Sequence, residues 1–200
     1  MTSGSVPAAG HEEIELKLPC EKLDTVLERL REAGARARSP LHFESNDLFD
    51  DSKARLSNAG CMLRLRRAGE QTRLTFKGPA HFRSGVKMRE EREVVVSDAA
   101  ETEAILLALG LERRFHYEKK REEWEFLGCL VALDQTPIGN FVEVEGDPPA
   151  IRRVVAALGL DFASAIPYSY ARLYSLRRQK EPSLPENMVF GDREAEGRQG

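Results

Sequence analysis

Charged side chains occupy alternate positions along several short segments of this chain, and their types could bind a polyanion together with a divalent cation. Carboxylates come in pairs such as Glu13 and Glu15, and carboxylate oxygens are preferred ligands of Mg²⁺ and Mn²⁺. Arginines recur in the same way at Arg64 and Arg66, and their guanidinium groups bind phosphate oxygens by two-point contacts. A triphosphate with its metal ions would satisfy both kinds of charge.

The alternation itself is the period of a β-strand, in which successive side chains point to opposite faces. In residues 12–18 the apolar side chains share one face, so that Glu13, Glu15 and Lys17 share the other. The same pattern predicts eight strands, at residues 12–18, 42–50, 61–67, 72–77, 86–96, 114–126, 130–134 and 140–146.

Helical segments interrupt these strands. Apolar residues at helical spacing follow Leu23 as far as Gly34, and the capping-box pair Asp98 and Glu101 opens a helix that ends at Gly110. Asp147 is expected to cap a third helix, which ends at Gly159, and residues 168–178 form a short last one. We expect an α+β fold in which helices cover the apolar face of a mainly antiparallel sheet.

An ordinary sheet with one wet, charged face would give the same alternation in any single strand. The whole set argues against that alternative, because solvent faces usually mix Thr, Ser and Gln with Lys, whereas these positions are nearly all carboxylate, guanidinium or ammonium. If helices cover the apolar face of the sheet, a strongly bent sheet would close around its charged face. Such an interior has a high desolvation cost unless a highly charged ligand belongs there.

Composition limits the partners and the location. The net charge of −3 gives no overall attraction to nucleic acid or to an anionic membrane, and no stretch approaches the length of a transmembrane helix. Three widely spaced cysteines and a start without a signal-peptide pattern make a cytoplasmic location the expectation. A homodimer is left open. We expect a domain at residues 12–178 between flexible ends at 1–11 and 179–200, with an apolar island at Met188 able to dock back.

The segment Glu13-Ile14-Glu15-Leu16-Lys17 resembles the ExExK signature of the CYTH family, named for class IV adenylate cyclases and thiamine triphosphatases. Later segments resemble the family's other motifs in its own order, namely its RxR strand at 61–67, its lysine strand at 74–79, its RxExE strand at 89–93 and its closing half at 118–121 and 133–145. The sequence is most similar to bacterial class IV adenylate cyclase-like proteins. The resemblance implies a closed antiparallel β-barrel of eight strands, a triphosphate tunnel with charged faces inside and helices outside.

The resemblance also implies roles for individual residues. The phosphate-binding set is Lys17, Arg64, Arg66, Lys77, Arg89, Lys119 and Arg121. The set that carries one or two Mg²⁺ or Mn²⁺ ions is Glu13, Glu15, Asp134, Glu143 and Glu145. Glu91 and Glu93 serve the metal or orient the basic residues, and Lys77 is the catalytic candidate that steers the attacking water or the leaving group. Some family triphosphatases pair such a lysine with a tyrosine on the second strand, which residues 46–50 lack here.

Two chemistries fit this pattern. Hydrolysis of an inorganic or organic triphosphate is favoured, because it requires no adenine pocket and no folded-back ribose. The alternative is a class IV adenylate cyclase, which converts ATP to cyclic AMP and pyrophosphate. A non-catalytic polyphosphate or nucleotide sensor is a third hypothesis, which the full set of carboxylates argues against. Inorganic triphosphate, ATP and thiamine triphosphate remain alternatives as substrates.

Overall fold

The computed structural model describes residues 11–191. The predicted flexible N-terminus, up to residue 10, and the end of the predicted flexible tail, from residue 192, lie outside the described residues. None of the described helices combines the length and the apolar character that a membrane span requires.

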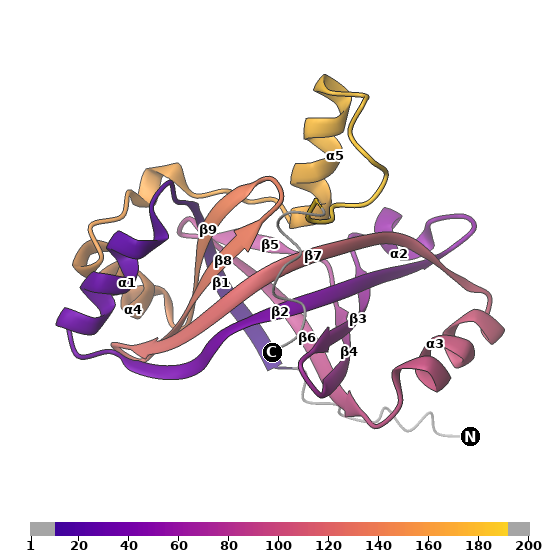
Figure 1. Cartoon of the computed structure of the whole chain (residues 1–200), viewed down its shortest axis with the longest axis horizontal. Coiled ribbons are helices and arrows are strands. Elements are labelled where there is room, and N and C mark those ends of the chain that lie inside the picture. The colour runs from indigo at the N-terminus through magenta and orange to yellow at the C-terminus, as the bar shows by residue number, and fades with distance from the viewer. Residues whose placement is uncertain (1–10, 192–200) are drawn as a thin grey trace, which may run out of the picture.

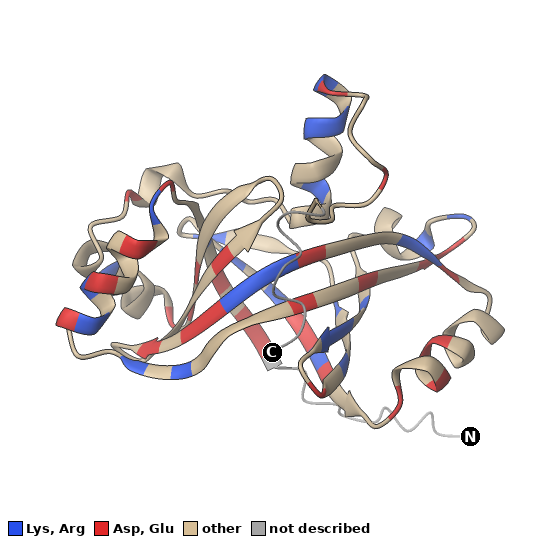
Figure 2. Ribbon diagram, viewed as in Figure 1, with Lys and Arg blue, Asp and Glu red and all other residues tan. Residues whose placement is uncertain are grey.

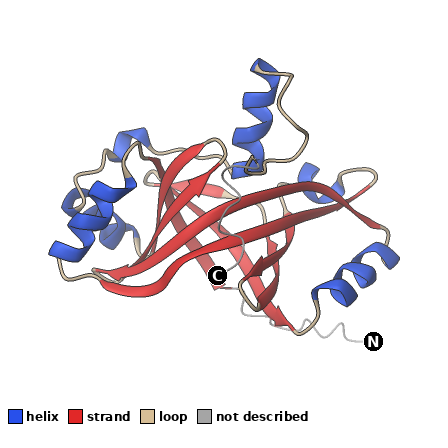
Figure 3. Cartoon of the chain, in the orientation of Figure 1, coloured by secondary structure: helices blue, strands red, loops and turns tan. Residues whose placement is uncertain are grey.

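One antiparallel sheet closes into a barrel (Figure 1, Figure 3). Its strands are β1 (His11–Pro19), β2 (Arg36–Asp51), β3 (Met62–Ala68), β4 (Gln71–Lys77), β5 (His81–Arg83), β6 (Val86–Val96), β7 (Leu111–Phe126), β8 (Cys129–Thr136) and β9 (Gly139–Glu145). The order β1-β9-β8-β7-β2-β3-β4-β6 returns to its start because β1 also pairs with β6, from Glu15 opposite Lys87 to His11 opposite Glu91. The predicted eight-stranded barrel is therefore confirmed.

The ninth strand, β5, pairs only with β6 and lies outside the closed ring. It is absent from the predicted set because three exposed residues carry no readable alternation. Strand β2 begins six residues earlier than predicted, at Arg36, and pairs along its length with β7. Register shifts near Ser39 and between Leu48 and Phe49 interrupt that pairing, and such irregularities bend a strand pair.

The helices pack on the outside of the barrel, as predicted. Figure 1 shows α1 (Leu23–Glu32) and α4 (Pro148–Ala157) together at one end and α3 (Ala99–Ala108) at the other. The largest apolar cluster joins α1 and α4 to the outward faces of β1, β8 and β9, and Leu30, Val142 and Ile151 in it are fully buried. The short helix α2 (Arg55–Asn58) and a 3₁₀ turn (Phe162–Ser164) complete the connections.

The predicted caps differ in how they act. The Asp98 side chain accepts hydrogen bonds from the backbone N–H groups of Ala100 and Glu101 and so caps α3. Asp147 occupies the N-cap position of α4, but its side chain makes no capping hydrogen bond. Pro148 at the first turn lacks one of the N–H groups that would need a partner.

The C-terminal region extends the body beyond the predicted boundary at residue 178. Helix α5 (Tyr170–Lys180) projects from the barrel in Figure 1, and the chain then returns to β7. Met188 is fully buried and forms a parallel bridge with Tyr117, and Phe190 is buried too. The tail predicted to be flexible from residue 179 therefore includes a docked segment, in the place where the apolar island at Met188 suggested one.

Replacement of Ile151 by Ala should lower the free energy of unfolding by about 2–5 kcal/mol, because its side chain is 0% exposed and the surrounding core cannot fully collapse. The matched control is Leu109→Ala, at a side chain that is 72% exposed, where we expect a change within about 0.5 kcal/mol. Urea unfolding followed by circular dichroism measures both. Equal losses would show that the core cluster is wrongly assigned.

Candidate functional site

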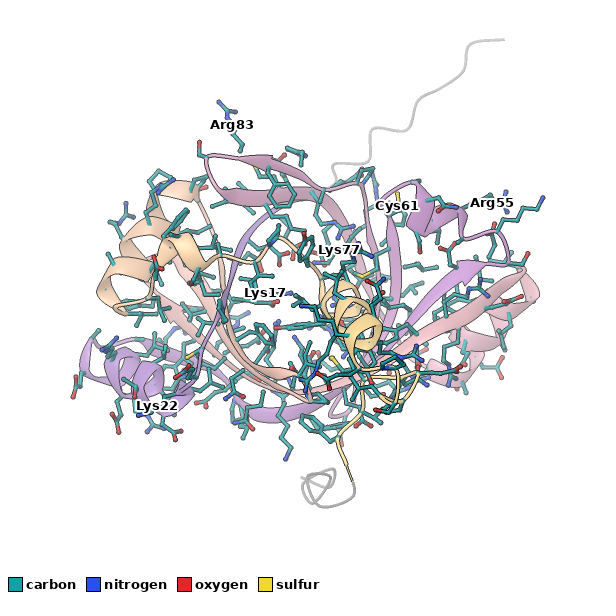
Figure 4. The ribbon with its side chains drawn as sticks, turned by 90° about the horizontal axis from the view of Figure 1, so that it is seen from above. Lys17, Lys22, Arg55, Cys61, Lys77 and Arg83 are labelled. Atoms are coloured by element: carbon teal, nitrogen blue, oxygen red, sulfur yellow. The ribbon has the colours of Figure 1, made fainter. Side chains whose placement is uncertain are left out.

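The barrel encloses a cavity of about 1060 Å³ whose wall consists mostly of charged residues. Ten lysine or arginine and nine glutamate side chains line it. Figure 2 shows basic and acidic residues gathered along the crossing strands, and Figure 4 shows Lys17 and Lys77 directed into the opening. A cavity of this kind suits a ligand that carries several charges.

Strand register explains why the charges point inward. In the β1–β9 pair Glu15 lies opposite Glu145 and Lys17 opposite Glu143, and all four line the cavity. The alternate residues, such as Leu16, pack into the outer apolar cluster with α1 and α4. The predicted division into an apolar outer face and a charged inner face is confirmed for these strands.

Thirteen of the fourteen predicted site residues line the cavity, and Asp134 is the exception. Its carboxylate is 0% exposed and accepts hydrogen bonds from Arg121, Lys119 and the Tyr170 hydroxyl. The donor–acceptor distances are 2.6 Å to Arg121 Nε and Nη2, 3.2 Å to Lys119 Nζ and 2.6 Å to Tyr170. Asp134 thus lies behind the cavity wall and holds three of its side chains.

Lys77 lies between two carboxylates. Its ammonium donates to both Glu13 oxygens and lies 3.0 Å from Glu91. Burial opposes the charged form, but the attractions of Glu13, Glu15 and Glu91 together outweigh it and raise the pKa of Lys77. Lys77 is therefore a cation at neutral pH.

Glu13 and Glu145 are carboxylates whose charge the wall only partly compensates. Burial, followed by repulsion from Glu15, raises the pKa of Glu13 to about 7. Burial also raises the pKa of Glu145. The attraction of Lys77 opposes this rise, and repulsion from Glu91 adds to it. Within residues 11–191 the side chain of Glu145 makes no hydrogen bond or ion pair, whereas that of Glu15 is paired with Lys87.

Neighbouring positions of the same wall carry well-compensated pairs. Glu143 accepts from Arg121 and lies 3.2 Å from Lys17. Burial disfavours its charge, yet the attraction of Lys17 and then of Arg121 holds the pKa of Glu143 well below its usual range. Lys119, 2% exposed, lies 3.4 Å from Glu44 as well as bonding to Asp134.

The arginines of β3 and β6 differ in whether their buried Nε–H groups have hydrogen-bond partners. Arg66 pairs with Glu93 at 3.1 Å and with Glu44 at 3.4 Å, and Arg64 Nη2 donates to Thr75 at 3.4 Å. The buried Nε atoms of Arg64 and Arg66 have no hydrogen-bond partner. Arg89 instead donates to the carbonyl oxygens of Gly78 at 2.9 Å and Lys77 at 3.1 Å, and so it also braces the end of β4.

Several site residues escape the sequence analysis. Glu44 is 2% exposed and pairs with Arg66 and Lys119, but no second acid lies two residues away from it in the sequence. Lys87 could have been predicted from the alternation of the strand, because it lies two residues before Arg89 and therefore on the same inward face. Tyr170 lines the cavity although it belongs to α5, and only the packing of that helix places it there.

The donor set suits a hard divalent cation, because the acidic groups of the wall are carboxylates throughout. Among residues 11–191 no three His, Cys, Asp or Glu side chains are gathered in a ready-made metal cluster. Lysines and arginines instead hold most of the carboxylates, including Glu13, Glu15 and Glu143. Glu145 remains available, next to Glu15 in the strand register.

Comparison with known proteins gives the same fold. The chain is similar to the solved structure of a candidate adenylate cyclase from Vibrio parahaemolyticus, with 21% identity and a TM-score of 0.72 over 83% of this chain and 99% of that one. The PH1819 protein of Pyrococcus horikoshii OT3 gives 23% identity and a TM-score of 0.70, also over 83% of this chain and 99% of that one. HpAC1 from Hippeastrum is a candidate adenylyl cyclase with a dominant triphosphatase activity. It gives 15% identity and a TM-score of 0.62 over 86% of this chain and 97% of that one.

The CYTH domain family matches residues 11–158, well over half of the sequence and the whole of the barrel. The match covers the strands that carry the predicted motifs, and the closed barrel with its charged interior agrees with it. The chain therefore belongs to the CYTH family.

Proposed function

We propose that this protein is a divalent-metal-dependent triphosphatase that hydrolyses an inorganic or organic triphosphate inside the barrel. The observation that carries the proposal is the enclosed cavity with ten basic and nine acidic side chains on its wall. Buried charges are costly unless they are compensated. A triphosphate would take the place of the carboxylates beside the basic residues, and Mg²⁺ or Mn²⁺ would take the place of the ammonium groups beside the acidic ones.

The phosphates would bind between β1, β3 and β7. Arg64 and Arg66 have unpaired buried Nε–H groups, and an unpaired buried donor favours an acceptor ligand. Lys17, Lys119 and Arg121 face the same cavity. Arg89, although predicted to bind phosphate, already donates to two carbonyl oxygens, and we propose that it supports the strand end that carries Lys77.

The metal would bind on the side of Glu145, with Glu15, Glu13 and Glu143 as further candidate ligands. Among the predicted metal ligands, Glu145 is the one whose carboxylate has no protein partner in the described chain, and its raised pKa reflects burial next to Glu91 and Glu15. A bound cation would screen the phosphates and act as a Lewis acid. Asp134, predicted as a ligand, already accepts from three side chains, and we propose that it orients Lys119 and Arg121 instead.

The cationic state of Lys77 defines its role in the reaction. In hydrolysis a water oxygen attacks the terminal phosphorus, the bond to the bridging oxygen breaks, and orthophosphate separates from the remaining phosphates. A protonated Lys77 cannot accept the proton of that water. It can donate a hydrogen bond to the leaving oxygen as negative charge develops there.

Adenylate cyclase activity is the second candidate function. In that reaction the ribose 3′-oxygen attacks the α-phosphorus of ATP and pyrophosphate leaves. The observation that favours it is that the cavity wall also includes the apolar side chains of Leu130 and Ala132, which could contact an organic group. A sensor without catalysis would not need the carboxylates that line the cavity.

The first test is product analysis with Mg²⁺ or Mn²⁺ and, in separate reactions, inorganic triphosphate, thiamine triphosphate and ATP. We expect orthophosphate release, with the fastest substrate identifying the physiological class. Cyclic AMP and pyrophosphate from ATP would establish the cyclase instead. Binding without turnover of any substrate would support the sensor.

Replacement of Glu145 by Gln should reduce metal-dependent turnover by at least a hundredfold and leave the fold intact, because it removes an unpaired carboxylate and keeps its shape. The control is Glu125→Gln, at an exposed carboxylate of β7 that pairs with Arg36 and Arg38, where we expect wild-type rates. Steady-state rates with Mn²⁺ and circular dichroism measure both effects. Full activity of Glu145→Gln would show that the metal site lies elsewhere.

Metal affinity should rise between pH 6 and pH 8. Because the pKa of Glu13 is about 7, a proton competes with the metal at pH 6 and is largely lost by pH 8. Mn²⁺ titration calorimetry should show a severalfold lower Kd at pH 8, and Glu13→Gln should flatten this dependence. The control Glu12→Gln, at an exposed neighbour on the same strand, should retain it. An equal Kd at both pH values in the wild type would contradict the assignment.

A further inference from the structure

Tyr170 brings a residue of α5 into the charged wall of the barrel. Its side chain is 6% exposed and lines the cavity. The ammonium of Lys17 lies 3.7 Å from the centre of its ring and that of Lys119 lies 5.5 Å away, and cations over an aromatic ring are attracted to its face. Its hydroxyl donates to Asp134 at 2.6 Å. One side chain thus contacts the two lysines and the carboxylate behind them.

The start of α5 holds Lys17 in a second way. Lys17 Nζ donates to the carbonyl oxygen of Tyr168 at 3.2 Å and is 3.2 Å from Glu143. The ammonium therefore lies between the ring of Tyr170, a carbonyl two residues before the start of α5, and a carboxylate of β9. Movement of α5 would remove two of these three contacts.

Helix α5 is itself fastened by the segment that follows it, residues 184–190, which we call the C-terminal strap. Tyr170 and Tyr174 are the buried side chains of α5. The Tyr174 hydroxyl donates to the carbonyl oxygens of Pro185 at 2.9 Å and Asn187 at 3.0 Å. The strap therefore supplies the acceptors for one of the two buried tyrosines.

The strap is bound in turn to β7, where that strand extends past the end of β8. Strand β8 pairs with β7 only from Lys120 onward, whereas residues 116–118 of β7 pair with β2 on one edge and with the strap on the other. Met188 N donates to His116 O at 3.0 Å, and Glu118 N donates to Met188 O at 2.9 Å. The strap thus takes the place of a strand at this edge, and full burial of Met188 anchors it.

We propose that Tyr170 is a positioning residue for triphosphate binding and that the C-terminal strap holds it in place. Tyr170 sets the ammonium of Lys17 directly, and through Asp134 it sets Lys119 and Arg121. The inference rests on the proposed function, because it assumes that these three cations hold phosphate. The region that matches the family ends at residue 158, so that α5 and the strap both lie outside it.

Direct binding of inorganic triphosphate, measured by titration calorimetry without divalent metal, tests the role of Tyr170. In Tyr170→Phe the ring remains and the hydrogen bond to Asp134 is lost, so we expect a Kd about tenfold higher, typical of a lost bond to a charged group. Tyr170→Leu removes the ring as well and should weaken binding further. In turnover assays KM should rise more than kcat falls, and circular dichroism should show that Tyr170→Phe keeps the wild-type fold.

A pair of shortened chains tests the strap. A chain that ends at residue 183 lacks the strap and should bind triphosphate as weakly as Tyr170→Leu, whereas a chain that ends at residue 191 keeps it and should match the full protein. Tyr174→Phe is a milder test, because it keeps the ring and loses only the hydrogen bonds to Pro185 and Asn187. We expect a severalfold higher Kd for this variant.

The outcomes separate this inference from the proposed function. If the full chain binds and hydrolyses triphosphate while Tyr170→Phe and Tyr170→Leu bind it equally well, the positioning role is wrong and the proposed function stands. If the chain ending at residue 183 binds normally, the strap has no part in it. If the full chain binds no triphosphate at all, the proposed function fails and this inference with it.

Discussion

The mutual compensation of buried charge is the interaction on which the rest of this structure depends. A closed ring of strands turns one face of every strand inward, and here that face carries ten basic and nine acidic side chains around one cavity. Each ion removed from water carries a penalty of several kcal/mol unless partners surround it. The interior is therefore ordered as a network, in which Lys119 lies between Glu44 and Asp134 and Lys77 between Glu13 and Glu91.

The same network makes the interior ready to exchange partners. The cations are held by carboxylates that a polyphosphate could replace, and the carboxylates are held by cations that a divalent metal could replace. The compensation is uneven. Glu143 is held well below its usual pKa, whereas the pKa values of Glu13 and Glu145 are raised. This imbalance distinguishes positions of the wall that suit anionic ligand groups from positions that suit a cation.

Elements outside the barrel help to hold the charged side chains in this arrangement. The apolar clusters under α1 and α4 fix the outward faces of the strands and so the direction of the inward ones. At the C-terminal end, aromatic contacts help to position the charged side chains. The centre of the Tyr170 ring lies 5.3 Å from that of Phe141 and 6.2 Å from that of Tyr117. Met188 and Tyr174 belong to the same buried cluster. A segment remote from the barrel in sequence therefore contacts the charged interior through one tyrosine.

Local pattern was sufficient to predict the eight strands of the barrel, their inward faces and the family, but not the short strand β5 or the start of β2. Alternation with period two depends only on neighbouring residues, which is why Glu13, Glu15 and Lys17 could be placed on one face and the order of motifs identified. The tertiary structure decided which charges compensate one another. Pairs such as Lys77 with Glu13 are 64 residues apart, and they depend on barrel closure and shear. For the same reason only the folded chain showed that Asp134 lies behind the wall, that Glu145 has no partner in the described chain, and that Tyr170 reaches the cavity.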